Sequence, residues 1–336
     1  MKRSLTILLF AFGVAGCDST STLTTLQVVN EVAWLPDQSG MLAIIQRQTQ
    51  DATTGTTSTT GGLFRVGADG TIGSQISMPD QQMLQSSYPN VIFISKNGRY
   101  AITQVGINIY RVDLQSNTAT NIISNQNLLG VSPGMKYLIC TETPPIGESG
   151  TRFAFVYDIS SSPIREVCQP TLNGVFDSRA LWLDDASFAF SARDSLRHYE
   201  VRIYDTLGTV KSTIPEALVA YHQSGYAPQA NALFVYDDSG SIDRVDLATG
   251  MRTAAVVHDT VQAMDVTTSA NLIAYISGGT QNPYTLYALN PQTGNRNAVA
   301  SSALAVVLSP NGDRAAYLRN SGGYPFDIQV VPIAVP

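Results

Sequence analysis

The chain has 336 residues, of which 44% are hydrophobic and 14% are charged, and its net charge is −6. This composition is sufficient for a large buried core. The acidic balance argues against nucleic acid as a partner, because binding to phosphate needs clustered Lys and Arg.

The N-terminus predicts export. Two positive charges in residues 1–3 precede an apolar run over 5–14. The residues at the end of this run are Val14, Ala15, Gly16 and Cys17. This order predicts a lipoprotein signal peptide over 1–16, with the small residues recognised by a signal peptidase and Cys17 as the lipidation site. An ordinary signal peptide with an incidental cysteine is the alternative.

A lipid on Cys17 would hold the mature protein on a membrane of the bacterial cell envelope, facing the periplasm. Asp18 resembles a signal for retention in the inner membrane, but the choice between inner and outer membrane stays open. Residues 17–25 are rich in Ser and Thr and predict a short tether.

Residues 26–336 predict one domain of repeated four-stranded modules. In the clearest module, 90–123, short strands are separated by turns at 95–98 and 114–117, and apolar residues alternate over 107–112. Similar turns begin at Asp113, Asp158, Asp205, Asp246 and Asn290. A repeat of roughly 40–45 residues with four strands is typical of a β-propeller. A β-sandwich or β-helix with similar hairpins is the alternative.

We therefore predict an all-β fold, a seven-bladed β-propeller whose strands are named a to d from the inside outwards. The predicted blades are 31–78, 90–123, 128–168, 175–214, 217–258, 261–300 and 302–336. The last module shows only three clear strands, so Leu23–Val29 is expected to complete it as the outer strand and to close the ring.

The turn residues have a physical reason. An Asp or Asn side chain accepts a hydrogen bond from backbone two residues on, and Gly tolerates positive φ. Ser309-Pro310-Asn311-Gly312 and Asp246-Leu247-Ala248-Thr249-Gly250 resemble the WD40-like repeats of TolB-type periplasmic propellers. The resemblance implies a propeller that acts in envelope assemblies. TolB also has an α/β domain before its propeller, and nothing comparable fits between Cys17 and the first repeat.

The b–c and d–a connections are predicted to be long, for example at 49–62, 142–151 and 169–177, and we expect them to form the working face together with the mouth of the central channel. The candidate partner-binding aromatics in these connections are Tyr88, Phe176, Tyr199, Tyr284 and Tyr324. Each could equally pack beneath its own loop.

No catalytic residue, metal site or cofactor is predicted. His198 falls in the fourth predicted blade, and His222 and His258 fall at the two ends of the fifth, without the spacing of metal ligands, and no Gly-x-Ser-x-Gly motif is present. Cys140 and Cys168 are expected on strands b and d of one blade, too far apart for a disulfide, and hence free.

The leading hypothesis is a membrane-anchored lipoprotein that binds an envelope protein or peptide through the b–c/d–a face. The alternative is a propeller enzyme of the lactonase or lyase type. A cluster of Arg, His and Glu at the central channel would favour the enzyme.

Overall fold

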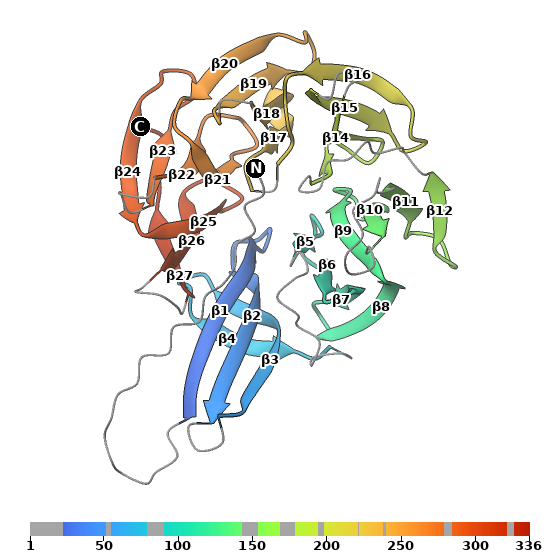
Figure 1. The fold of residues 1–336 in the computed structure, drawn as a ribbon, viewed down its shortest axis with the longest axis vertical. Coiled ribbons are helices and arrows are strands. Elements are labelled where there is room, and N and C mark those ends of the chain that lie inside the picture. Colours follow the sequence, from blue (N-terminus) through green and yellow to red (C-terminus); the bar gives the residue numbers. More distant parts are fainter. Residues whose placement is uncertain are drawn as a thin grey trace.

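The computed structural model describes residues 23–51, 55–78, 91–142, 154–168, 179–193, 198–220, 222–237, 240–278, 284–320 and 326–336. Within them, seven small antiparallel sheets stand in a ring (Figure 1). The predicted seven-bladed β-propeller is confirmed. The only helical element of these residues is one 3₁₀ turn, Pro228–Ala230. None of the described helices is long and apolar enough to cross a membrane.

Six sheets have four strands each, ordered along the chain from the inside outwards. Blade 1 consists of β1 (Leu23–Trp34), β2 (Gly40–Asp51), β3 (Thr57–Gly67) and β4 (Ile72–Ile76). Blade 2 consists of β5 (Ile92–Ile94), β6 (Tyr100–Val105), β7 (Asn108–Asp113) and β8 (Thr118–Ser124). Blade 3 consists of β9 (Gln126–Val131), β10 (Tyr137–Glu142), β11 (Ala154–Asp158) and β12 (Arg165–Cys168). Blade 4 consists of β13 (Leu181–Trp182), β14 (Ser187–Arg193), β15 (Tyr199–Asp205) and β16 (Val210–Pro215). Blade 5 consists of β17 (Gly225–Ala227), β18 (Ala232–Tyr236), β19 (Ile242–Asp246) and β20 (Arg252–Val257). Blade 6 consists of β21 (Val261–Val266), β22 (Ile273–Ser277), β23 (Thr285–Leu289) and β24 (Arg296–Ser301). Blade 7 has β25 (Ala303–Leu308), β26 (Arg314–Asn320) and β27 (Phe326–Pro332).

The turns form for the predicted reasons. Oδ1 of Asp113 accepts the N–H of Gln115 at 2.9 Å, and Asp246 accepts that of Ala248 at 3.0 Å. In the turns between strands a and b, a buried serine accepts a backbone N–H five residues on. These bonds join Ser95 to Tyr100, Ser132 to Tyr137 and Ser309 to Arg314, at 2.9, 3.1 and 3.0 Å. Gly312 closes its turn with φ of +74°, which other residues rarely adopt.

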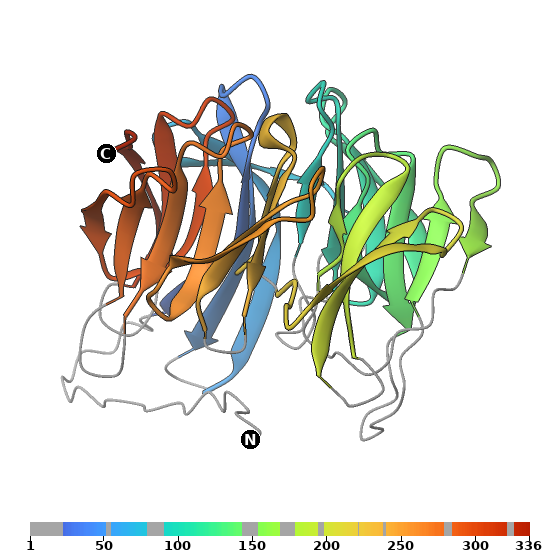
Figure 2. The same ribbon diagram turned by 90° about the horizontal axis from the view of Figure 1, so that it is seen from above.

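The core lies between neighbouring blades rather than within any one of them. One cluster packs Leu42 of blade 1 on Tyr110 of blade 2, and another packs Phe64 of blade 1 on Leu318 of blade 7. Each sheet thus buries its faces against its neighbours, which is why the repeat folds as a ring. Seen edge-on, the strands run from one end of the ring to the other, so the a–b and c–d turns share one end (Figure 2).

The prediction for the N-terminal strand is wrong. Leu23–Val29 does not complete blade 7 but begins β1, which pairs with β2 from Leu23 opposite Asp51 to Trp34 opposite Met41. A bulge at Asn30 lets the strand continue while its buried side changes from odd to even positions, so Val29 and Val32 are both buried. This break in alternation made one strand look like two. Blade 7 has three strands in the described part of the chain.

The Thr-rich segment after residue 49 is also different from the predicted loop. β2 and β3 stay paired from Gly40 opposite Gly67 to Gln50 opposite Thr57. Thr is β-branched and favours strands, so Thr57, Thr59 and Thr60 belong to β3 and lengthen the hairpin. β1, β2 and β3 together make an arm that extends beyond the other blades (Figure 1).

Side chains join blade 7 to blade 1 where no strand is shared. The Trp34 indole N–H donates to the Val307 carbonyl at 3.3 Å. The Arg314 guanidinium lies 4.7 Å from the Trp34 ring centre and donates to the carbonyls of Gln38 and Ala68 at 3.4 and 3.5 Å. We call Trp34 and Arg314 the seam.

The expectation of free cysteines is confirmed. Cys140 on β10 and Cys168 on β12 are separated by β11. Burial raises the pKa of the Cys140 thiol well above its usual value and that of Cys168 to about 11. Neither is a reactive thiolate at neutral pH.

Candidate functional site

Most of the predicted site residues lie outside the described residues. These are Val14, Ala15, Gly16, Cys17, Tyr88, Phe176 and Tyr324. Of the predicted loop aromatics, Tyr199 begins β15 and is half-buried, and Tyr284 precedes β23 and is 37% exposed. They belong to blades 4 and 6, with blade 5 between them.

Ionisable side chains from four blades interact with one another inside the ring. They are Glu31 on β1, Arg179 before β13, His222 before β17 and Asp265 on β21, and we call them the axial cluster. His222 Nε2 lies 3.4 Å from Glu31 Oε2. Blades 5 and 1 are not neighbours, so this contact reaches across the interior of the ring. The Arg179 guanidinium lies 5.1 Å from the Phe93 ring of blade 2, which again joins blades that are not adjacent.

Burial controls the charges of the axial cluster. It lowers the pKa of His222 to about 3, with a smaller contribution from the positive charge of Arg179, while Glu31 at 3.4 Å acts in the opposite direction. Burial also raises the pKa of Asp265, whose carboxylate accepts the N–H groups of Leu308 and Val266, both at 2.8 Å. At neutral pH the imidazole is therefore neutral, beside the Glu31 carboxylate and within the electric field of the Arg179 guanidinium, which suits polar binding.

Sequence reasoning missed the axial cluster. His222 has no metal or triad spacing around it, and its partner Glu31 lies in the first blade, far from it along the chain. The available signal was charge inside predicted inner strands, because Glu31 and Asp265 interrupt otherwise apolar runs. In the described part of the chain, no group of three or more His, Cys, Asp and Glu could hold a metal ion.

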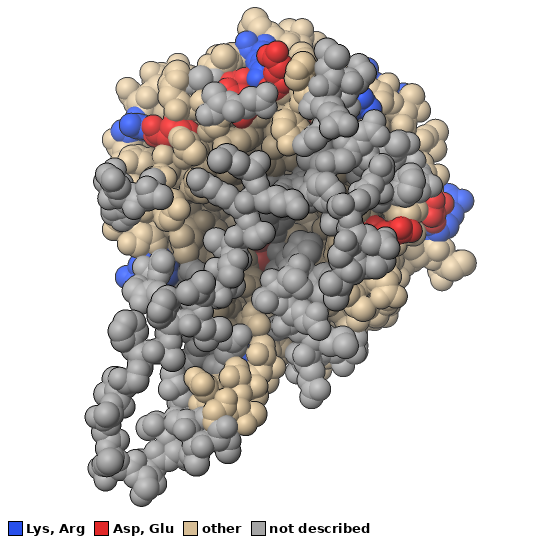
Figure 3. Space-filling view, in the orientation of Figure 1, with Lys and Arg blue, Asp and Glu red and all other residues tan. Residues whose placement is uncertain are grey.

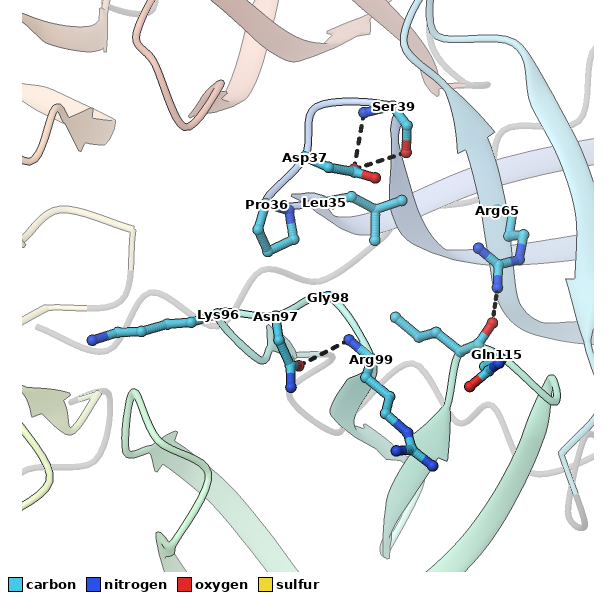
Figure 4. Close-up of a pocket in the computed structure, with 11 residues that line it drawn as sticks. Leu35, Pro36, Asp37, Ser39, Arg65, Lys96, Asn97, Gly98, Arg99 and Gln115 are labelled. Carbon is cyan, nitrogen blue, oxygen red and sulfur yellow. Dashed lines mark hydrogen bonds between the residues drawn. The ribbon is translucent and has the colours of Figure 1, made fainter.

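A groove of about 550 Å³ lies between blades 1 and 2, at the a–b/c–d end (Figure 4). On the blade 1 side it is lined by Leu35, Pro36, Asp37, Ser39 and Arg65. On the blade 2 side it is lined by Lys96, Asn97, Gly98, Arg99, Leu114 and Gln115. This is the end opposite to the predicted working face.

Charge is dispersed on the side of the molecule drawn in Figure 3. Among the described residues there, Lys and Arg lie beside Asp and Glu near the rim instead of forming a basic stripe (Figure 3). This side thus lacks the pattern that binding to a nucleic-acid backbone requires.

No family model matches the chain, and no curated protein matches it. Several solved structures are similar to this chain. An oligogalacturonate lyase in complex with manganese has a TM-score of 0.65 and 12% identity, over 93% of this chain and 91% of the lyase. The likeness is one of fold. An oligogalacturonate lyase from Vibrio parahaemolyticus also has a TM-score of 0.65 and 12% identity, over 94% of this chain and 92% of the lyase. A chain of a mitotic checkpoint complex has a TM-score of 0.58 and 15% identity, over 99% of each chain.

Proposed function

We propose that this chain is an exported lipoprotein, similar to TolB-type propellers, that binds an envelope protein or peptide at the b–c/d–a end of its ring. Its main support is the sequence, which joins a lipoprotein signal over 1–16 to turns that resemble those of TolB-type propellers. Two members of the axial cluster, Arg179 and His222, come from d–a connections and so lie toward the end where Tyr199 and Tyr284 also lie, whereas Asp265 lies next to the a–b turn of blade 6. Converging polar groups with shifted pKa values are typical of ligand sites.

The lipid anchor would orient this end. β1 begins at Leu23, beside the last residue of β2, and this is the b–c end of blade 1. Cys17 precedes Leu23 by six residues, a span of roughly 20 Å when fully extended. A lipid on Cys17 would thus keep the binding end close to the membrane, and the expected partner is a protein or peptide at the membrane surface.

Affinity purification from native membranes tests the binding proposal. We expect one partner to be recovered with the wild type and recovered several-fold less with His222→Ala and with the double variant Tyr199→Ala, Tyr284→Ala. Leu207→Ala is the matched control, because Leu207 is 71% exposed on a turn at the opposite end. Equal recovery with every variant would refute the proposal.

The axial cluster favours a second candidate, a propeller enzyme such as a lyase, because it brings Glu31, Arg179 and His222 together inside the ring, the arrangement expected of an enzyme. A neutral His222 can accept a proton, and Glu31 can orient the imidazole and stabilise its charged form. Two of the fold neighbours are oligogalacturonate lyases, so oligogalacturonate is the first substrate to try.

The purified protein would be incubated with oligogalacturonate, with and without Mn²⁺, and unsaturated product would be followed by ultraviolet absorbance. The enzyme proposal expects product with the wild type and its loss with His222→Asn, whereas His258→Asn, at an exposed histidine, keeps activity. Absence of product under both conditions would count against a lyase of this class.

A further inference from the structure

The groove between blades 1 and 2 is positively charged although the whole chain has a net charge of −6. Its cations are Arg65, Lys96 and Arg99. Arg99 has a partner, since it lies 3.6 Å from Asp113. Arg65 and Lys96 have no carboxylate within ion-pair distance among the residues that the structure describes. The groove therefore has positive charge available for a ligand.

Arg65 is held in a fixed position. Its Nε and Nη2 groups donate to Oδ1 of Asn117 at 3.2 and 2.9 Å, and Nη2 also donates to the Leu114 carbonyl. Both partners belong to the c–d turn of blade 2, so the side chain bridges the two blades. The Nη1 donors make no hydrogen bond within the described part of the chain. A guanidinium that is already fixed loses little entropy when it binds an anion.

The acidic residue of the groove does not neutralise these cations. Oδ1 of Asp37 accepts hydrogen bonds from the N–H and the hydroxyl of Ser39, at 3.0 and 2.8 Å, so this oxygen is directed to its own loop (Figure 4). The backbone bond from Ser39 is the main reason that the pKa of Asp37 is lowered. Asp37 is exposed, and water screens its charge.

The space between the two available cations is partly apolar. Leu114 is only 5% exposed, and Leu35 and Pro36 are half-buried. Lys96 and Arg65 lie on opposite sides of Leu35 and Pro36 in Figure 4, and the exposed Lys96 side chain extends away from Arg65. We infer that the groove binds a small organic anion, with acidic groups directed to Lys96 and Arg65 and an apolar stem over Leu35 and Leu114. The volume of about 550 Å³ suits a molecule of that kind.

Isothermal titration of the purified chain with octanedioate tests this site, with octanoate and inorganic phosphate as comparison probes. We expect octanedioate to bind one site per chain, more tightly than either comparison probe and more weakly as salt is raised. Lys96→Ala and Arg65→Ala should each weaken it about tenfold, the usual effect of losing one charge-assisted contact.

Lys211→Ala is the charge-matched control, because Lys211 pairs with Asp205 at 2.8 Å on blade 4. It should bind octanedioate as the wild type does. Arg65→Ala also removes contacts between blades, so Lys96→Ala, at an exposed residue, is the deciding variant. Unchanged affinity in Lys96→Ala, no binding of octanedioate, or equally tight binding of phosphate would each overturn the assignment.

Discussion

His222 is neutral at ordinary pH because burial disfavours its charged form. The groups that face it are Glu31 and Arg179, which act in opposite directions. A histidine in this state links folding to pH. The folded chain takes up this proton only near pH 3, whereas the unfolded chain takes it up near the usual pKa of about 6.5.

The free energy of unfolding should therefore fall as pH drops below about 6.5. Each further unit removes up to about 1.4 kcal/mol through His222 alone. Urea unfolding between pH 7.5 and 5 measures this slope, and His222→Gln should make it shallower. His258→Gln, which changes an exposed histidine, is the control. Equal slopes for wild type and His222→Gln would show that His222 is not the linked group.

Gly130 is a second residue whose role is specific, because it allows blades 3 and 4 to approach closely. A Cβ at this position would lie 2.4 Å from the carbonyl oxygen of Ala180. The Ala180 N–H donates to the Leu129 carbonyl at 3.0 Å, so the backbone cannot move aside without losing that bond.

Gly130→Ala is expected to lower the free energy of unfolding by about 3 kcal/mol, as overpacking against backbone does. Gly294→Ala is the comparison, because Gly294 has positive φ but nothing within 4 Å of an added Cβ. The free energy of unfolding of Gly294→Ala should fall by only about 1 kcal/mol. Urea unfolding of both variants checks the difference, and equal losses would mean that blade contact at Gly130 is unimportant.

At the scale of elements, the seam replaces a shared strand. Arg314→Ala removes the contact with the Trp34 ring and the bonds to the Gln38 and Ala68 carbonyls, and should lower the free energy of unfolding by about 1–3 kcal/mol. Arg165→Ala, whose side chain is 72% exposed and 3.7 Å from Asp158, should change it by less than about 1 kcal/mol. Thermal unfolding compares the stability of the two variants. A smaller loss with Arg314→Ala than with Arg165→Ala would show that the seam does not stabilise the ring.

Comparing the elements shows which features local sequence is sufficient to predict. The turns at Ser309 and Asp246 depend on side chains that bond backbone a few residues away, so local sequence predicts them. Pairing of β1 depends on the bulge at Asn30, which local alternation does not reveal. The Glu31–His222 contact exists only because the ring places blades 1 and 5 across from each other, so no local pattern contains it.

At the scale of the whole molecule, the lipid anchor is the first property to test. Cys17→Ser should move the protein from the membrane fraction to the soluble periplasmic fraction, because lipid chains on Cys17 would be the means of attachment. Cys168→Ser is the control, since Cys168 is a half-buried thiol within blade 3. Fractionation followed by immunoblotting measures both, and a Cys17→Ser protein that stays on the membrane would disprove the anchor.

The sheets that the structure describes are each made from strands that follow one another along the chain. None of these sheets has to wait for a strand from the opposite terminus, so the pairings are local and the entropy of loop closure is small. A chain emerging from a ribosome or a secretion pore can complete one blade while the next is still unfolded. Trp34 and Arg314 then meet last, when blade 7 reaches blade 1.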